Sequence, residues 1–348
     1  MSVNKSVAFI RASGDPYTIG LTHGAALADA LRSFLDDSLC RLNKVMPEPV
    51  TLGGLLPSIA DYRSVIAAAL PELADEVAGL AAGAGISEDE AWLLQLRREI
   101  MGYRKVPTSG DCTTYARAHT AGPVLAQTVD LNGDLDEFIS VLEIARSGTE
   151  RRALVLSFGG LLGYLGVNSD GLAIGLNLVL GGEWRPGVPP YLAIRHLLDT
   201  AENVEQALEI LAGLRLASSR SLTLCDRKRA VCVEVLGEAT RVFEGSETVH
   251  TNHFLHPDFG PADEINVFAR NSSVRRLRTA AEGLAGLGPL ADPEEHFALL
   301  SQPPICVPDR GDIRAERTVA AVVLLPVEGR MHLRPGDPSR SRTQVFPL

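Results

Sequence analysis

The chain has 348 residues and a formal net charge of −10, which argues against a surface for nucleic acid or for an anionic membrane. Hydrophobic residues make up 45% of the chain and charged residues 22%, as in an ordinary globular protein. This length allows one large domain or two modest ones.

The five cysteines are odd in number and scattered, which fits a reducing cytoplasm better than a disulfide framework. The first residues lack the apolar core of a signal peptide, and no apolar run reaches the roughly eighteen residues of a membrane span. We therefore expect a cytoplasmic protein with neither a membrane nor a nucleic acid as partner.

Residues 16–105 read mainly as helix. The segment 20–39 is rich in Ala and Leu at helical spacing, and the segment 71–82 repeats the pattern. Pro71 suits a first helical position, and Gly83 is expected to end that helix.

A further helix is expected from Ser87-Glu88-Asp89-Glu90 through Ile100, because these four residues are typical of a capping box with acids in the first turn. The polar stretch 107–111 then breaks the helical pattern. We place the end of the N-terminal helical segment there.

After Cys112 the periodicity becomes that of short strands, and Ser169-Asp170-Gly171 is a favourable hairpin turn because glycine tolerates positive φ. Strands are expected at 124–129, 139–145, 153–158, 165–168, 172–178, 221–226, 230–235, 240–243, 318–326 and 331–334. Helices are expected at 189–199, 204–214, 273–283 and 293–300. Strands and helices that alternate in this way predict an α+β sandwich.

Cys112 stands at the transition between the two halves. Gly110 and Asp111 favour a tight turn before it, and Thr113-Thr114 favours a strand after it. A thiol at such a turn can attack the carbonyl of Asp111, and hydrolysis of the resulting thioester leaves Cys112 with a free α-amine. The ordinary pKa of that amine lies near neutral pH, so it can act as general base for the thiol of the same residue.

Four motifs recur in this order in one family. They are Asp111-Cys112-Thr113-Thr114, Gln127-Thr128-Val129-Asp130, Gly175-Leu176-Asn177 and Thr251-Asn252-His253. With Gly14-Asp15-Pro16-Tyr17, Gly20-Leu21-Thr22-His23-Gly24 and the 166–172 segment, the chain resembles the acyl-coenzyme A–penicillin (isopenicillin N) acyltransferase-like N-terminal-nucleophile hydrolases over nearly its whole length. Conjugated bile salt hydrolases and acid ceramidase-like amidases are more distant relatives.

This resemblance implies a role for each matching residue. Cys112 is the expected nucleophile, its amine the base, and Asp130 the group that holds the amine. Asn252 is expected to donate its amide to the oxyanion, and Asn177 matches a second asparagine near the oxyanion in the bile salt hydrolase relatives. Such donors are typically worth a few kcal/mol of barrier. Thr113, Thr128 and Arg317 are weaker candidates for substrate contacts.

Each of these residues also has a purely structural interpretation. Asp130 and Asn252 can begin turns, Asn177 can end a strand before Gly181-Gly182, and Arg317 can be a solvated arginine. His250, His253 and His256 do not favour a metal site, since strand positions three apart point to opposite faces and Pro257 disfavours a helix.

The sequence departs from the penicillin acyltransferase pattern at two positions. Asp111 stands where that enzyme has glycine, and Val129 stands where an aromatic residue is expected. The arginine that bile salt hydrolase relatives carry near the aspartate is also missing. These differences bear on the identity of the substrate more than on the mechanism of the reaction.

The resemblance thus implies a four-layer αββα N-terminal-nucleophile sandwich in which self-cleavage between Asp111 and Cys112 separates residues 1–111 from residues 112–348, with both pieces staying associated. The expected activity is that of an amidohydrolase on a small N-acyl compound through a thioester acyl-enzyme. An acyl-CoA-dependent N-acyltransferase is the first alternative, and an uncleaved, non-enzymatic binding protein is the second. No cofactor or metal is expected, and coenzyme A enters only as a co-substrate in the acyltransferase alternative.

Overall fold

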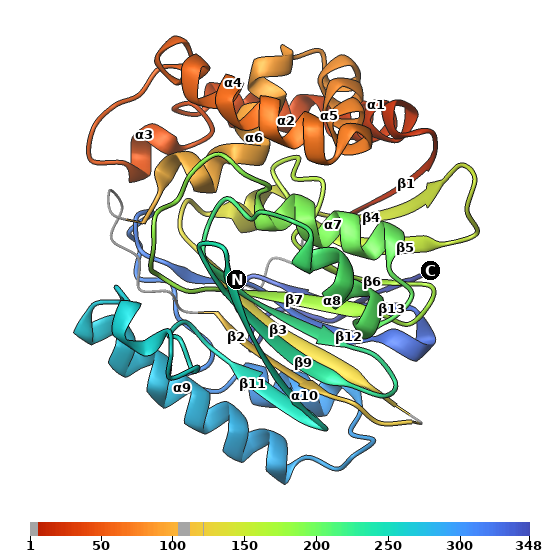
Figure 1. The fold of residues 1–348 in the computed structure, drawn as a ribbon, viewed down its shortest axis with the longest axis vertical. Helices are drawn as coiled ribbons and strands as arrows, with labels where there is room; N and C mark the ends of the chain where they lie inside the picture. Colours follow the sequence, from red (N-terminus) through yellow and green to blue (C-terminus); the bar gives the residue numbers. More distant parts are fainter. Residues whose placement is uncertain (1–5, 104–111, 121) are drawn as a thin grey trace.

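The computed structural model describes residues 6–103, 112–120 and 122–348. It is a mixed α+β structure with two β-sheets and an N-terminal helical region, which gathers at one end of the molecule (Figure 1). The predicted α+β class is therefore confirmed. None of the helices in the described part of the chain has the length and apolar character needed to cross a membrane.

The N-terminal region contains a strand followed by the expected run of helices. Its elements are β1 (Ala8–Gly14), α1 (Pro16–Ala26), α2 (Ala28–Asp36), α3 (Leu42–Val45), α4 (Leu52–Ala69), α5 (Pro71–Ala84) and α6 (Glu88–Met101). The capping box at Ser87 is confirmed, because its hydroxyl accepts from the backbone N–H of Glu90 while the Glu90 carboxylate accepts from that of Ser87.

Helix α5 does not end at Gly83, so that prediction is wrong. Gly83 lies inside the helix against α1, where a Cβ would come within 2.1 Å of the Leu21 carbonyl oxygen. The helix ends instead at Gly85, whose φ of +66° suits the left-handed cap. Gly20, Gly24 and Gly79 meet backbone in the same way, so these glycines permit α1 and α5 to pack with their backbones nearly in contact.

The larger sheet has eight strands in the order β1-β4-β5-β6-β7-β8-β9-β10. After β1, its strands are β4 (Ile139–Arg146), β5 (Arg152–Phe158), β6 (Leu165–Asn168), β7 (Ala173–Leu178), β8 (Arg220–Cys225), β9 (Ala230–Leu236) and β10 (Ala239–Gly245). The predicted hairpin at Gly171 is confirmed: its φ is +91°, and β6 and β7 pair antiparallel on either side.

The smaller sheet has six strands in the order β11-β2-β3-β12-β13-β14. They are β11 (Glu247–His250), β2 (Thr113–Arg117), β3 (Val124–Leu131), β12 (Arg317–Leu325), β13 (Arg330–Pro335) and β14 (Gln344–Pro347). Strands β2 and β3 face β7 and β8 of the larger sheet, so the start of β2, directly after Cys112, lies between the two sheets.

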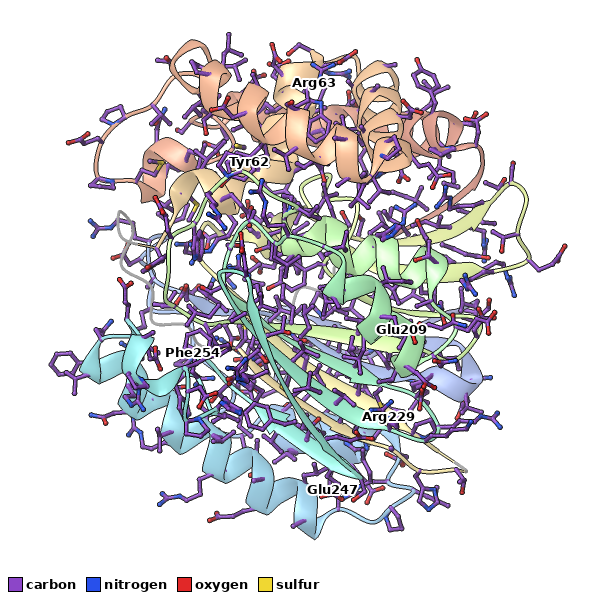
Figure 2. The ribbon with its side chains drawn as sticks, viewed as in Figure 1. Tyr62, Arg63, Glu209, Arg229, Glu247 and Phe254 are labelled. Atoms are coloured by element: carbon purple, nitrogen blue, oxygen red, sulfur yellow. The ribbon has the colours of Figure 1, made fainter. Side chains whose placement is uncertain are left out.

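The later helices cover the outer faces of the sheets. Helices α7 (Pro190–Thr200) and α8 (Val204–Ala212) contact the larger sheet, and α9 (Val267–Gly286) and α10 (Pro293–Leu300) contact the smaller one (Figure 1). Three short 3₁₀ helices, η1 (Leu135–Phe138), η2 (Gly260–Ala262) and η3 (Pro326–Glu328), complete the elements of the described residues. Neighbouring side chains of one helix can face opposite ways. On α4, Tyr62 is buried toward the sheets, while Arg63 reaches the exterior (Figure 2).

The region before Cys112 is joined to the rest of the chain by two kinds of contact. Strand β1 pairs in parallel with β4, from Ala8 opposite Ser140 to Gly14 opposite Arg146. Beneath it, Arg195 of α7 donates from both terminal nitrogens to the Glu76 carboxylate of α5 at 2.7 Å, and both side chains are almost fully buried. The N-terminal region is therefore more than a helical segment, because it supplies an edge strand and half of a buried ion pair.

Candidate active site

One cavity contains the three side chains on which the sequence interpretation depends most. Cys112, Asp130 and Asn252 line it together with residues of α2, α6, α7, β7 and β8. Its volume, measured as the space open to the centre of a water molecule, is about 60 Å³, enough for a few waters. Asp111, the other half of the expected cleavage site, lies outside the described residues.

The thiol of Cys112 is buried beside the backbone of Asp130. The Asp130 N–H donates to Sγ at 3.3 Å, and Sγ lies 3.6 Å from the Asp130 carbonyl oxygen. Burial, and next the negative charge of Asp130, raise the pKa of the Cys112 thiol well above its ordinary range. The thiol is therefore protonated in the intact chain and needs a base before it can act as a nucleophile.

Asp130, near the end of β3, is contacted by Thr128, which is in turn bonded by Thr113. Its Oδ2 lies 3.3 Å from Thr128 Oγ1, and that hydroxyl also accepts from the Thr113 backbone N–H at 3.2 Å. Thr113 and Thr128 do not line the cavity, so their contacts position Asp130 and the start of β2.

Asn252 lies at the cavity wall with a defined amide orientation. Its Oδ1 accepts from Arg276 at 3.0 Å, while its Nδ2 donates to the Leu178 carbonyl at 2.9 Å. Since arginine is only a donor, these two contacts identify which end of the amide is nitrogen. Asn252 thus lines the cavity with its amide held in one orientation.

Asn177 lies behind the cavity. Its Nδ2 donates to the carbonyl oxygen of Cys112 at 3.1 Å, and its side chain is fully buried. It does not line the cavity, unlike its neighbours Leu176 and Leu178. The structure therefore brings Asn177 to the main chain of Cys112.

Arg317 lies apart from the other candidates. Its guanidinium binds Asp136 at 2.7 Å and Asp134 at 3.0 Å, and it does not line the cavity. It is thus engaged in an ion-pair cluster at the start of β12.

Arg276 of α9 is a site residue that the sequence interpretation missed. It is fully buried and donates from Nη1 to the Cys112 carbonyl at 2.7 Å and to Thr113 Oγ1 at 3.1 Å, and from Nη2 to Asn252. A signal for it existed: Ala269, Ser273, Arg276, Ala280 and Leu284 form the buried stripe of α9 at helical spacing.

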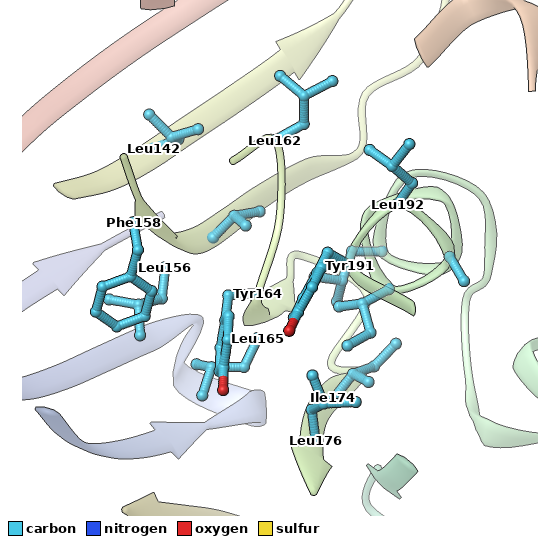
Figure 3. Packing of buried hydrophobic residues seen from close by; sticks show 14 of the residues in the cluster. Leu142, Leu156, Phe158, Leu162, Tyr164, Leu165, Ile174, Leu176, Tyr191 and Leu192 are labelled. Atoms are coloured by element: carbon cyan, nitrogen blue, oxygen red, sulfur yellow. The ribbon is translucent and has the colours of Figure 1, made fainter. Parts of the chain in front are cut away.

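Aromatic rings form part of the cavity wall. Tyr164 and Tyr191 stack with centroids 5.3 Å apart, and Phe158 meets Tyr164 edge-on at 5.2 Å (Figure 3). Burial raises the pKa of both tyrosines, so their hydroxyls stay neutral.

Three arginines also reach the cavity: Arg97 and Arg98 from α6 and Arg220 from β8. Arg98 and Arg220 lie over the Trp184 ring, with guanidinium carbons 5.6 and 4.8 Å from its centroid. The lining thus combines apolar walls with cationic groups and with the carboxylates of Asp130 and Glu316, an arrangement suited to a small organic molecule.

The histidines around Asn252 have polar partners of their own. His250 Nε2 lies 2.9 Å from Glu234, and His253 Nδ1 lies 2.7 Å from Ser273 Oγ. Across residues 6–103, 112–120 and 122–348, no group of three His, Cys, Asp or Glu side chains is arranged to hold a metal ion.

Comparison with known structures finds folds of low similarity. An N-acylethanolamine-hydrolyzing acid amidase ortholog from Caenorhabditis elegans is 19% identical, with a TM-score of 0.45, and the match covers 68% of this chain and 100% of that chain. Penicillin V acylase from Agrobacterium tumefaciens is 15% identical, with a TM-score of 0.46 and coverage of 64% and 82%. A mutant conjugated bile acid hydrolase from Clostridium perfringens is 10% identical, with a TM-score of 0.48 and coverage of 68% and 92%.

Comparison with protein families is more informative. A family model described as acyl-coenzyme A:6-aminopenicillanic acid acyl-transferase matches residues 118–340, which is more than half of the chain. The match begins after Cys112 and includes Asp130, Asn177, Asn252 and Arg276. The family resemblance stated from the motifs is confirmed, and the chain belongs to the acyl-coenzyme A:6-aminopenicillanic acid acyl-transferase family.

Proposed function

We propose that the protein cleaves itself between Asp111 and Cys112 and then acts as an N-terminal-cysteine amidohydrolase on a small N-acyl compound. The observation that carries this proposal is the convergence of the Cys112 thiol, Asp130 and the oriented Asn252 amide on one cavity. A nucleophile, an ionisable group beside it and an oriented donor are the parts that acyl transfer needs.

The activating cleavage is an acyl shift followed by hydrolysis. The Cys112 sulfur attacks the Asp111 carbonyl carbon, the peptide C–N bond breaks, and the thiol proton ends on the released amine. Water then cleaves the thioester, which gives Asp111 a new carboxyl group and returns the thiol to Cys112. Arg276 and Asn177 both donate to the Cys112 carbonyl. These hydrogen bonds support self-cleavage at this position, because they hold the main chain next to the bond that is cleaved.

In turnover the new α-amine takes the proton of the thiol, and the thiolate attacks the substrate amide. Asp130 holds the amine, and the Asn252 amide stabilises the oxyanion. The substrate amine leaves with the proton, and water then releases the acyl group from sulfur. Asn177 acts in this scheme by fixing the Cys112 main chain.

We also infer that the fold is the four-layer αββα sandwich of N-terminal-nucleophile hydrolases and that residues 1–111 and 112–348 stay together in the cytoplasm after cleavage. The helices over the outer face of each sheet support the layer order. The β1–β4 pairing and the Glu76–Arg195 ion pair support the association, because both cross the cleavage point.

A second candidate is an N-acyltransferase that uses an acyl-coenzyme A donor. It is favoured by the description of the matched family, which names an acyl-coenzyme A donor and an amine acceptor. The two candidates share the acyl-enzyme and differ in whether water or an amine receives the acyl group.

The test is to measure cleavage and activity on one preparation. Intact mass and N-terminal sequencing of the purified wild type should reveal a chain that begins at Cys112, while Cys112→Ala should stay uncut. The processed protein should then release amines from a small-amide library, scored by mass spectrometry with and without acyl-coenzyme A and free amines. An active wild type that remains one uncut chain would overturn the proposal.

A further inference from the structure

Arg97 is a buried cation that no carboxylate of the described residues neutralises. Its side chain is 8% exposed and lines the cavity that contains Cys112. Its Nε donates to the Cys40 carbonyl at 2.8 Å, but Nη2 has no hydrogen-bond partner among the described residues. Within the same described ranges, no carboxylate lies within 4.0 Å of this guanidinium. A buried guanidinium without a carboxylate partner lowers the stability of the fold unless an anion neutralises it.

Two nearby arginines have carboxylate partners, whereas Arg98, which also lines the cavity, has an Nη2 without a hydrogen-bond partner among the described residues. Arg41 is equally buried, at 8% exposure, yet it pairs with Asp37 at 2.9 Å and with Glu137. Arg220 lies 3.6 Å from Glu99 and over two aromatic rings. Arg97 therefore differs from Arg41 and Arg220, which have carboxylate partners, and its side chain lines the cavity.

A second unpartnered donor lies in the same wall. Asn132 is buried and lines the cavity, and no acceptor in the described part of the chain meets its Nδ2. The adjacent Gly133 leaves room for the guanidinium, because a Cβ at this position would lie 2.8 Å from Arg97 Nη2. Arg97 and Asn132 thus line a cavity whose other lining residues include the apolar Phe34 and Leu94 and the carboxylates Asp130 and Glu316.

We propose that Arg97 and Asn132 form a carboxylate subsite, so that the substrate is an N-acyl compound that carries an acid group beside an apolar segment. This inference rests on the proposed amidohydrolase function. A carboxylate neutralises the guanidinium and accepts from both donors, whereas a neutral amide leaves the charge unmatched. The acid belongs either to the acyl group or to the amine that leaves, and both sources present the same chemistry to this subsite.

The first experiment compares matched substrates on the processed protein. One pair, hexanoyl-glycine and hexanoyl-glycinamide, differs in the acid on the amine side. The other pair, a glutaryl amide and its terminal carboxamide, differs in the acid on the acyl side. For one pair we expect kcat/KM to be roughly ten- to a hundredfold higher with the acid, as for a charge-assisted hydrogen bond. Equal rates with acid and carboxamide in both pairs would overturn the subsite.

Variants then assign the preference to its residues. Arg97→Met should abolish the preference for the acid while the carboxamide is still hydrolysed. Asn132→Asp should weaken the preference because it places a negative charge in the subsite while the Arg97 side chain is retained, which keeps the proposal testable if Arg97→Met does not fold. Arg41→Gln is the matched control, since it removes a buried guanidinium outside the cavity and should keep the preference. A preference that survives both Arg97→Met and Asn132→Asp refutes the assignment.

A binding measurement separates this inference from the proposed function. Hexanoate should raise the melting temperature of the wild type but not of Arg97→Met, and it should act as a competitive inhibitor. If the wild type hydrolyses no amide yet binds hexanoate through Arg97, the amidohydrolase proposal fails and the carboxylate subsite stands. If amides are hydrolysed without acid preference and hexanoate does not bind, the subsite fails and the amidohydrolase stands.

Discussion

Arg276 donates a 2.7 Å hydrogen bond to the main-chain carbonyl of Cys112, which precedes it by 164 residues. Its other terminal nitrogen binds Asn252 Oδ1. One rigid guanidinium therefore fixes the distance between the expected nucleophile and the expected oxyanion donor, a task that suits the planar fork of arginine.

Replacement of Arg276 by lysine should lower kcat and slow self-cleavage by roughly ten- to a hundredfold, because one ammonium cannot satisfy both acceptors in that geometry. KM should change little, since Arg276 does not line the cavity. Steady-state kinetics and the fraction of cut chain over time measure the two effects. Arg275→Lys, on the exposed face of the same helix, is the control and should match the wild type.

Replacement of Asp130 by asparagine should lower kcat roughly a hundredfold or more and leave KM nearly unchanged, as expected for a group that places the catalytic base. A carboxylate beside the α-amine raises the pKa of that amine, so its loss should move the acidic limb of the kcat/KM profile to lower pH. Asp134→Asn is the control, as its carboxylate pairs with Arg317. A processed Asp130→Asn protein with near-wild-type kcat and an unshifted profile would remove Asp130 from the mechanism.

Asn252→Ala should cost on the order of 10²–10³ in kcat, the usual loss for one oxyanion donor. It should also slow self-cleavage if the same donor serves the intermediate at Asp111. Asn266→Ala is an informative comparison, because Asn266 only caps α9 and its loss should cost about 1 kcal/mol of stability with kcat intact. If Asn252→Ala shows that same pattern, with a lower melting temperature and full kcat, Asn252 is structural.

Glu76→Gln should destabilise the fold by about 1–3 kcal/mol, since Arg195 loses one charged partner inside the protein but keeps its ion pair with Asp199. Glu72→Gln should cost less than about 1 kcal/mol, because Glu72 pairs with Arg146 from an exposed position. Chemical denaturation of both variants in the uncut Cys112→Ala background gives the comparison. Equal losses for the two variants would contradict a special role for the buried pair.

His23 predicts a specific loss of stability in acid. Burial, with Arg195 nearby as the second cause, lowers the pKa of His23 from 6.5 to about 3. Below pH 6.5, His23 binds a proton in the unfolded chain but stays neutral in the folded chain. The free energy of unfolding should therefore fall as the pH drops from 6.5 toward 3. His23→Leu should flatten this part of the curve of unfolding free energy against pH. Parallel curves for the two proteins would show that His23 does not titrate in this way.

The sequence was informative where the signal is local. Caps and periodicity located the start of α5, helix α6 and the β6–β7 hairpin, and the motif order singled out Cys112, Asp130 and Asn252, which line one cavity. The sequence alone did not reveal contacts between residues that lie far apart along the chain. Strand β1 acquires its partner only through β4. Helical spacing places Arg276 on the buried stripe of α9, but it does not indicate that Arg276 binds the Cys112 carbonyl and Asn252. Arg97 likewise reads as one of two adjacent helical arginines until the burial of α6 is known.

Strand β1 is the outermost strand of the larger sheet, and it precedes the expected scissile bond. If the piece before Cys112 departed, β4 would present a bare row of N–H and C=O groups to any other extended chain. The portion before Cys112 would therefore cover the edge of β4 permanently. Recombinant 112–348 made without it should be prone to aggregate. The fragment before the cut would then be required for the fold after cleavage as well as before it. Expressing the two halves separately should therefore not yield active protein.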